Sequence, residues 1–497
     1  MTRRLGSVFD LSRCAVTLGC LAVLGCKVGP DYERPPVAPP AAFRGAEARN
    51  AAAQESIANV PWWELFKDQQ LRDLIKVALE QNRDLKIAIE RIEEARANFG
   101  ISKADLYPQV NARVLGGGLN PSDASLTHTP NESGGSGATG LFDVGLSLSW
   151  EIDFFGRVRR ANEATKATML ATEEAKRAVA VALVSDVAMA YIDLRGLDRR
   201  LAITKETLKS REEHVEYARV RFEGHVAQQV DLRQSEAEFH RVRAQLYNLE
   251  KLVAQKENEL SFLVGRQPGE IIRNRGADEQ PVPPEVPVGL PAELLERRPD
   301  VRKAELELWS ATARIGEAKA ALYPSIKLTG SYGLASTDLS ELVNPASQSW
   351  NIFAGLLQPI FAGGALRGKV EVRQSQQRQA VYAYERTLLQ ALREVEDALI
   401  SLRKMSQQRD EQRDRTTAER QVVELAELRY KGGVSSYLEV LDAQRSLFNA
   451  EIDDATTASE HARSLIQLYK ALGAGWPVPV KKADSGTNAE PAKQTSG

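Results

Sequence analysis

Apolar and polar residues alternate along four segments of the chain, and this pattern predicts four β-strands. The clearest segment is 142–152, where polar residues or glycine alternate with Phe142, Val144, Leu146, Leu148, Trp150 and Ile152. The same period of two occurs around residues 109–114 and 325–332, and less regularly at 350–360. Because successive side chains of a strand point to opposite faces, each predicted strand has one apolar and one polar face.

Long segments with apolar residues at helical spacing surround the strands. Residues 65–105 predict one helix that ends before Tyr107-Pro108, since the residue before a proline avoids the helical region. Residues 157–222 contain no proline and predict a helix of roughly 100 Å. A third helix is predicted after Gly224, to about Val264. Alanine-rich faces favour close antiparallel packing of such helices.

The whole arrangement occurs twice in the sequence. Residues 221–226 (Arg-Phe-Glu-Gly-His-Val) return as residues 429–434 (Arg-Tyr-Lys-Gly-Gly-Val), an offset of 429 − 221 = 208 residues. In the second copy we expect helices over 292–321, 366–430 and 435–472. An offset this long differs from the short periods of solenoid arrays, so it predicts one large structural unit used twice.

The ends of the chain differ from the two copies in composition. Residues 1–25 combine arginines with an apolar run that is too short to span a membrane, which predicts a secretory signal peptide. The tetrad that ends at Cys26 resembles a lipoprotein cleavage site, after which Cys26 would be the acylated first residue. Cys20 is a weaker alternative because Thr17 stands three residues before it, and an ordinary signal with an incidental cysteine is another. We expect a lipid-anchored extended leader at 26–60, the first copy at 61–266, a linker at 267–290, the second copy at 291–475 and a disordered tail at 476–497.

Bulk composition argues against several classes of protein. The 65 basic and 67 acidic residues nearly cancel, so no nucleic-acid partner is expected. The five histidines lack metal-site spacing, and no nucleophile and base form a catalytic pattern, so we expect no metal, no cofactor and no enzyme activity. Residues 363–370 nearly match a phosphate-binding loop, but Val370 stands where a hydroxyl should bind magnesium. We interpret these glycines as chain-reversal residues.

Strand length and aromatic residues favour a membrane location for the strands. Strands of roughly 9 to 11 residues with one apolar face match transmembrane β-strands, although a soluble sheet on a core is the alternative for any single strand. Four strands cannot close a barrel, and open edges are not tolerated in lipid, so other copies of the chain must complete it. The aromatic residues at strand ends, where interfacial belts are expected, are Tyr107, Trp150, Phe154, Phe155, Tyr323, Trp350 and Phe361.

Together these features resemble the outer-membrane efflux protein family, the TolC-like outer-membrane factors, and especially the lipoprotein branch that serves resistance-nodulation-division efflux systems. Residues 26–32, 150–157 and 433–449 carry the resemblance, which covers about residues 26–475. It implies an α+β membrane protein in the outer membrane. The expected assembly is a homotrimer, whose twelve-stranded β-barrel is continued by a long α-helical barrel extending into the periplasm.

The resemblance also implies a function and partners. We expect a passive duct of a tripartite efflux pump, which carries drugs or small toxic solutes from a periplasmic adaptor protein and an inner-membrane efflux transporter to the exterior. A duct for type I protein secretion is an alternative within the same fold. A periplasmic coiled-coil scaffold or adaptor is an alternative of another class, which accounts for the helices but not for the strands.

The candidate working residues lie at the turn between the two long helices of the second copy. There the resemblance implies a periplasmic constriction lined by carboxylates, matching Glu439 and Asp442, with Tyr430 in the network that tethers it. In a trimer each carboxylate would form a ring of three, as in a cation filter. Asp231, the repeat counterpart of Glu439 (439 − 208 = 231), is a further candidate.

A structural role is the alternative for one of these carboxylates. Ser436 and Glu439 have the Ser-x-x-Glu spacing of a helix capping box, in which a carboxylate is stabilised in any case. Some family members have an arginine where this chain has Ser435, so an arginine lock at that position is not expected here.

Overall fold

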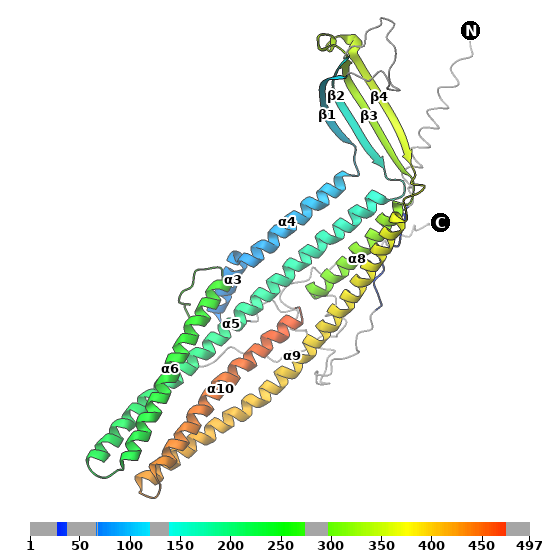
Figure 1. Ribbon diagram of the computed structural model, residues 1–497. Helices are drawn as coiled ribbons and strands as arrows, with labels where there is room; N and C mark the ends of the chain where they lie inside the picture. Colours follow the sequence, from blue (N-terminus) through cyan, green and yellow to red (C-terminus); the bar gives the residue numbers. More distant parts are fainter. Residues whose placement is uncertain (1–26, 37–65, 67, 120–138, 274–296, 474–497) are drawn as a thin grey trace, which may run out of the picture. The chain divides into compact units, whose positions relative to one another are not determined.

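The computed structural model describes residues 27–36, 66, 68–119, 139–273 and 297–473. These residues form long helices and a four-stranded sheet (Figure 1). Cys26 and most of the predicted leader, linker and tail lie outside the described residues.

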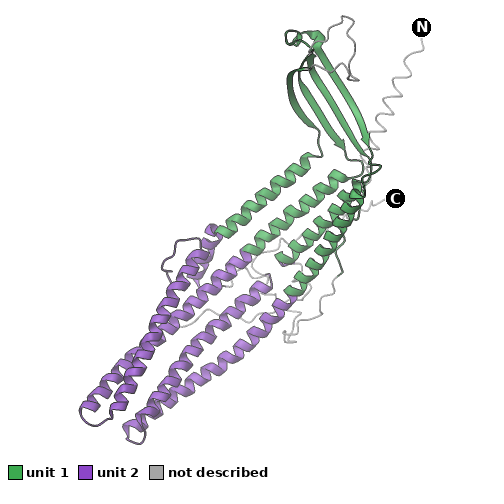
Figure 2. Cartoon of the chain, viewed as in Figure 1, with its two compact units in different colours: residues 1–39, 83–179, 299–391 green, residues 40–82, 180–298, 392–497 purple. Residues whose placement is uncertain are grey.

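The chain forms two compact units, and each unit draws on both copies of the repeat (Figure 2). One unit contains the sheet and the helical segments next to it in sequence. The other contains the turns that join the long helices. The first unit comprises residues 1–39, 83–179 and 299–391, and the second comprises residues 40–82, 180–298 and 392–497.

The sheet is antiparallel, with strand order β1-β2-β3-β4, and it confirms the four predicted strands. The last strand ends earlier than predicted. Pro359 has no N–H to donate to a ladder, so pairing stops before it. The strands are β1 (Gln109–Leu119), β2 (Thr139–Ile152), β3 (Ser325–Ser336) and β4 (Gln348–Leu357).

Strand register gathers most of the apolar residues of the four strands on one face, whereas Leu115, Leu141, Phe353 and Leu357 lie on the other. Leu146 on β2 lies opposite Ala112 on β1 and Tyr332 on β3, and Tyr332 lies opposite Trp350 on β4. The other face carries polar residues, among them an ion pair of Arg113 with Asp143 at 2.7 Å. The apolar face is exposed in the single chain; Val114, for example, is 78% exposed and Ile352 is 68% exposed.

The predicted helix at residues 65–105 is divided, so the prediction of one continuous helix was wrong. The structure has α3 (Gln69–Gln81) and α4 (Arg83–Ala104), which are separated at Asn82. The Asn82 side-chain amide donates to the Leu263 carbonyl at 2.9 Å. A Cβ on Gly265, whose φ is +74°, would lie 2.5 Å from the Gln81 carbonyl oxygen. A distant segment therefore packs against the break.

The remaining helices follow the predicted plan closely. The helix α8 (Pro299–Ala320) precedes β3, and it contacts α5 (Arg157–Glu223) through a hydrogen bond between Thr168 and Ser310 at 3.0 Å. Within the described ranges, no helix is both long enough and apolar enough to cross a membrane. The long helices are α5 (Arg157–Glu223), α6 (Gln229–Leu263), α9 (Ala365–Lys431) and α10 (Tyr437–Ala471).

The two turns between long helices have equivalent geometry. The Val226 N–H donates to the Arg221 carbonyl at 2.9 Å, and the Val434 N–H donates to the Arg429 carbonyl at 2.9 Å. The left-handed position of these turns holds His225 (φ 60°) in the first copy, and its counterpart in the second copy is a glycine with φ 71°. The 208-residue repeat in sequence is thus a repeat of structure.

The near match to a phosphate-binding loop is explained by chain reversal. Gly363 and Gly364, which precede α9, have φ values of 57° and 83°. Gly156, at the corresponding junction before α5, has a φ of 80°. Glycine adopts this left-handed region without the steric cost that a Cβ would impose. The interpretation of these residues as turn glycines is confirmed.

Candidate functional site at the turns of the long helices

The aromatic residues at strand ends occupy both ends of the sheet. Trp350 lies near the end at which β3 leads into β4, opposite Tyr332. The Phe155 and Tyr323 rings, which follow β2 and precede β3, stack with centroids 4.9 Å apart. Trp150 donates through Nε1 to the Leu106 carbonyl at 3.1 Å. Tyr107, Phe154 and Phe361 also lie where strands meet helices, and they are 59%, 38% and 91% exposed. A role at a membrane interface remains a prediction.

Tyr430 lies in a contact between the two copies of the repeat. Its hydroxyl accepts a hydrogen bond from Arg221 Nη1 at 2.9 Å. The same guanidinium donates to the Tyr217 hydroxyl at 3.2 Å and lies 5.3 Å from the Tyr430 ring centroid. A cation over an aromatic face adds electrostatic attraction to these hydrogen bonds. Arg221 on α5 therefore links the first copy to the end of α9.

Glu439 is paired across the turn and does not complete the capping box. Arg429 Nε lies 3.1 Å from Glu439 Oε1, and the two side chains are 56% and 44% exposed. The Ser436 side chain makes no capping hydrogen bond to the start of α10. The capping-box interpretation was therefore wrong. Since Arg429 lies within reach, the carboxylate forms an ion pair, which stabilises little at this exposure.

The other two predicted carboxylates have different surroundings. Asp442 lies on α10, three residues after Glu439, and its side chain is exposed. Asp231 lies in the first turn of α6 and accepts the backbone N–H of Gln228 at 3.3 Å. Asp231 thus caps the start of its helix, whereas Asp442 is free of such a structural task in the described part of the chain.

Beneath the turn, Gln444 on α10 is the centre of a buried polar cluster. Its side-chain carbonyl accepts a hydrogen bond from Arg211 Nη1 on α5. Its side-chain N–H₂ lies 3.0 Å from Glu427 Oε1 on α9 and 3.2 Å from His214 Nε2 on α5. Arg211 is 4% exposed and Gln444 is 8% exposed. Burial, followed by the nearby charge of Arg211, lowers the pKa of His214.

A second polar contact joins α6 to α10 at the same level. Glu238 on α6 accepts from Arg445 on α10, and it also accepts from Arg241 Nε at 2.9 Å. The two arginines hold the pKa of Glu238 below its usual value, although burial acts in the opposite direction as the largest effect. Close by, Ser235 donates to the Tyr437 hydroxyl at 3.2 Å. The α10 helix is thus bound through polar groups to both α5 and α6.

The sequence indicates Tyr430 but neither its partner nor the buried cluster. Arg221 carries a signal, since it is the repeat counterpart of Arg429 in the duplicated segment. Gln444 also carries one, because it interrupts an apolar helical stripe that includes Leu441 and Phe448. A polar side chain on such a stripe needs a hydrogen-bonding partner, and here the partner comes from another helix.

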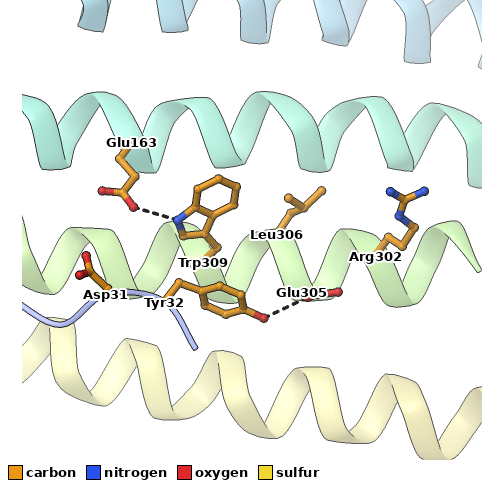
Figure 3. Close-up of a pocket in the computed structure, with 7 residues that line it drawn as sticks. All are labelled: Asp31, Tyr32, Glu163, Arg302, Glu305, Leu306 and Trp309. Carbon is orange, nitrogen blue, oxygen red and sulfur yellow. Dashed lines mark hydrogen bonds between the residues drawn. The ribbon is translucent and has the colours of Figure 1, made fainter. Parts of the chain in front are cut away.

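A pocket of about 460 Å³ lies beside the leader, and several of the polar side chains that line it are hydrogen-bonded to one another (Figure 3). Trp309 donates to Glu163 at 2.9 Å, and Tyr32 of the leader donates to Glu305 at 3.2 Å. Glu305 also pairs with Arg34 of the leader at 2.8 Å. These carboxylates hold the leader in place, so we do not assign a ligand to this pocket.

A buried arginine fixes the start of the same leader. Arg160 is 1% exposed and donates to the carbonyls of Val28 and Gly29 at 3.2 and 3.1 Å. Gly29 has a φ of 101°, and a Cβ built there would lie 2.4 Å from Gly316 Cα on α8. Two glycines therefore meet where the leader crosses α8, and no other residue fits at this contact.

The two copies correspond to a known protein family. The sequence profile of the family described as Outer membrane efflux protein matches residues 74–266 and 290–474. The chain belongs to the outer membrane efflux protein family.

Individual members of this family align over nearly the full chain. The cation efflux system protein CusC of Escherichia coli O157:H7 is 34% identical over 94% of this chain and 100% of its own length. The toluene efflux pump outer membrane protein TtgC of Pseudomonas putida is 35% identical over 98% of this chain and 99% of its own length. The solved structure of the outer-membrane channel OprN matches with a TM-score of 0.83 and 28% identity, covering 91% of this chain and 100% of that one.

Proposed function

We propose that this protein is the outer-membrane channel of a tripartite efflux system and conducts small solutes passively to the exterior. The observation that carries the proposal is the sheet: four strands share one exposed apolar face, and β2 leads within five residues into the 67-residue helix α5. An apolar face next to a polar one suits a wall between lipid and a water-filled lumen. The names of CusC and TtgC as efflux proteins support the same function.

The channel would be a homotrimer. β1 and β4 are the outer strands of the sheet, so each has a backbone edge without a partner strand in the described residues. Lipid does not tolerate such edges, because bare N–H and C=O groups have no water to bind there. Three copies joined edge to edge would supply twelve strands, an even number within the range of outer-membrane barrels. The long helices of three copies would continue it as an α-helical barrel.

A lipid on Cys26 would reach the same end of the sheet as most of the aromatic residues. The Val28 N–H donates to the Phe155 carbonyl at 3.3 Å, and Phe155 follows β2 directly. Arg160 holds the next residues of the leader in place. The attachment of the leader thus supports an anchor at the periplasmic surface of the outer membrane.

The helix turns would form the periplasmic entrance. A periplasmic adaptor and an inner-membrane transporter would supply substrate and energy, and this chain would supply the passage. Glu439 and Asp442 would each form a ring of three carboxylates near this entrance, and the tether of Arg221 to Tyr430 would hold the entrance narrow.

Purification and reconstitution of the full chain test this proposal. We expect detergent extracts of outer membranes to yield a trimer by mass measurement, and the trimer to give discrete ion conductance in planar bilayers. A single chain that is released without detergent and does not conduct would overturn the proposal.

A further inference from the structure

The side-chain amide of Gln444 uses all of its hydrogen-bonding groups to join three helices. An arginine can only donate, so the contact with Arg211 identifies the Gln444 atom facing it as the carbonyl oxygen. The two amide hydrogens then point to Glu427 on α9 and His214 on α5. One side chain therefore holds α10 to α5 and α9 together.

This arrangement also determines the protonation state of His214. Because the Gln444 nitrogen donates, His214 Nε2 must accept, so the ring is neutral and carries its proton on Nδ1. The charged groups that act on it are Arg211 and Glu213 from α5, and Glu427 and Lys431 from α9. From α10 the Tyr437 ring lies 6.5 Å away.

The cluster lies where it can control the proposed constriction. Gln444 lies on α10 two residues after Asp442 and five residues after Glu439, so fixing Gln444 fixes the helical turns that carry both carboxylates. The cluster is incompletely satisfied: within the described residues, the buried Nε of Arg211 has no hydrogen-bond partner. An incompletely satisfied buried network contributes little net stability, so a small change can release it.

We propose that Gln444 is a positioning residue for the constriction, which holds α10 against α5 while His214 is neutral and releases it when His214 binds a proton. This inference rests on the proposed function as a channel. A protonated His214 would point an N–H at the amide hydrogens of Gln444 and would be attracted to Glu427. Gln444 would then lose its His214 contact and share Glu427 with the imidazolium. Its remaining contact to α5 would be with Arg211, whose charge the imidazolium repels.

The direction of the pH effect follows from proton binding. Burial and Arg211 lower the pKa of His214 in the joined arrangement, whereas release exposes the ring to water and brings its pKa back toward the ordinary value of about 6.5. The released arrangement therefore binds more protons. Acidification from about pH 7 to about pH 5.5 favours release, and the joined arrangement is favoured above this range.

Single-channel recording of the reconstituted full-length protein tests the inference. We expect the open probability of the wild type to rise about tenfold from neutral to acidic pH, the scale of a typical coupling between sites. His214→Gln keeps an acceptor but cannot titrate, so it should stay closed at both pH values. Gln444→Leu keeps the volume but removes the amide, so it should be open at both. His240→Gln is the matched control, because His240 is exposed on α6, and it should behave as the wild type.

A distance measurement tests the same inference without conductance. Spin labels on Glu223→Cys and Lys431→Cys would report the separation of the two helix turns, in trimers diluted with unlabelled chains. We expect the distance to increase at acidic pH in the wild type and at both pH values with Gln444→Leu. A distance independent of pH, or a pH response that survives His214→Gln, would overturn the inference. Absence of any conductance would overturn the channel proposal instead, and the distances alone would then decide the role of Gln444.

Discussion

Arg221 and Arg429 occupy equivalent positions in the two copies, yet they bind different partners. Arg221 donates to the Tyr430 hydroxyl of the other copy at 2.9 Å, whereas Arg429 pairs with Glu439 of its own copy at 3.1 Å. The two turns therefore share their backbone geometry but differ in their side-chain contacts. Arg221 of the first copy restrains the turn of the second, whereas within the described residues Arg429 contacts only its own copy.

Arg221→Ala is expected to loosen the proposed entrance more than Arg429→Ala. The first change removes a charge-assisted hydrogen bond between copies. We expect the free energy that favours the closed entrance to fall by about 1 kcal/mol, which corresponds to about a fivefold rise in open probability. The second removes an exposed ion pair and should change little. Single-channel recording of both variants measures the difference. Equal effects would show that the contact between copies has no special role.

Asp442→Ala is expected to lower the cation preference of the reconstituted channel. A ring of exposed carboxylates attracts cations, and removing three charges from a trimer weakens that attraction. Reversal potentials in asymmetric salt measure the selectivity, and Asp442→Glu should restore it. If Asp442→Ala conducts with the selectivity of the wild type, Asp442 does not act as a filter.

Leu146→Lys is expected to impair membrane insertion, whereas Ser147→Lys should be tolerated. Leu146 belongs to the apolar face of the sheet, opposite Ala112 and Tyr332, and Ser147 belongs to the polar face. A lysine facing lipid costs about 2 to 4 kcal/mol near the bilayer midplane, while one facing water costs little. The amount of trimer recovered from outer membranes checks this. Equal recovery of both variants would mean that this face does not meet lipid.

Gly316→Ala is expected to dislodge the leader, and Gly100→Ala is its matched control on another helix. A Cβ at Gly316 would lie 2.7 Å from Arg160 Nε and 2.8 Å from the Val28 carbonyl oxygen, whereas at Gly100 it would meet nothing within 4 Å. Crowding of this kind costs about 2 kcal/mol, while an alanine in an open helical position stabilises by about 1 kcal/mol. Thermal unfolding measures the stability of both variants, and proteolysis of the leader shows whether it has been dislodged. A Gly316→Ala protein as stable as the wild type would contradict this account.

His461→Leu is expected to stabilise the protein in acid and to flatten the dependence of Tm on pH. His461 is 9% exposed, and its buried Nδ1 has no hydrogen-bond partner among the described residues. Burial, followed by Arg409, lowers the pKa of His461. The unfolded chain therefore binds this proton more readily, so wild-type stability falls as the pH drops below about 6.5.

Thermal unfolding by circular dichroism at about pH 7 and about pH 5.5 checks this prediction. In His461→Leu the slope of Tm against pH should be smaller than in the wild type but not zero, because the fold also lowers the pKa of His214. An unchanged slope would exclude a contribution from His461.

The sequence by itself determined the elements whose cause is local. A period of two predicted the strands, a period of 3.6 predicted the helices, and the 208-residue repeat predicted the equivalence of the turns at His225 and Gly433. It also placed Tyr430 and Asp442 near one turn. The strand and helix periods depend on residues a few positions apart, and the repeat is a likeness between two segments of the same chain, so the sequence displays both directly.

Tertiary structure decided which distant groups meet. The break at Asn82 depends on Leu263, 181 residues away, and the partner of Tyr430 lies 209 residues away. Glu439 pairs with Arg429 across the turn and does not complete a capping box. The neutral state of His214 follows from the contacts of Gln444. Hydrogen bonds act over a few ångströms of space, and folding alone sets which residues come that close.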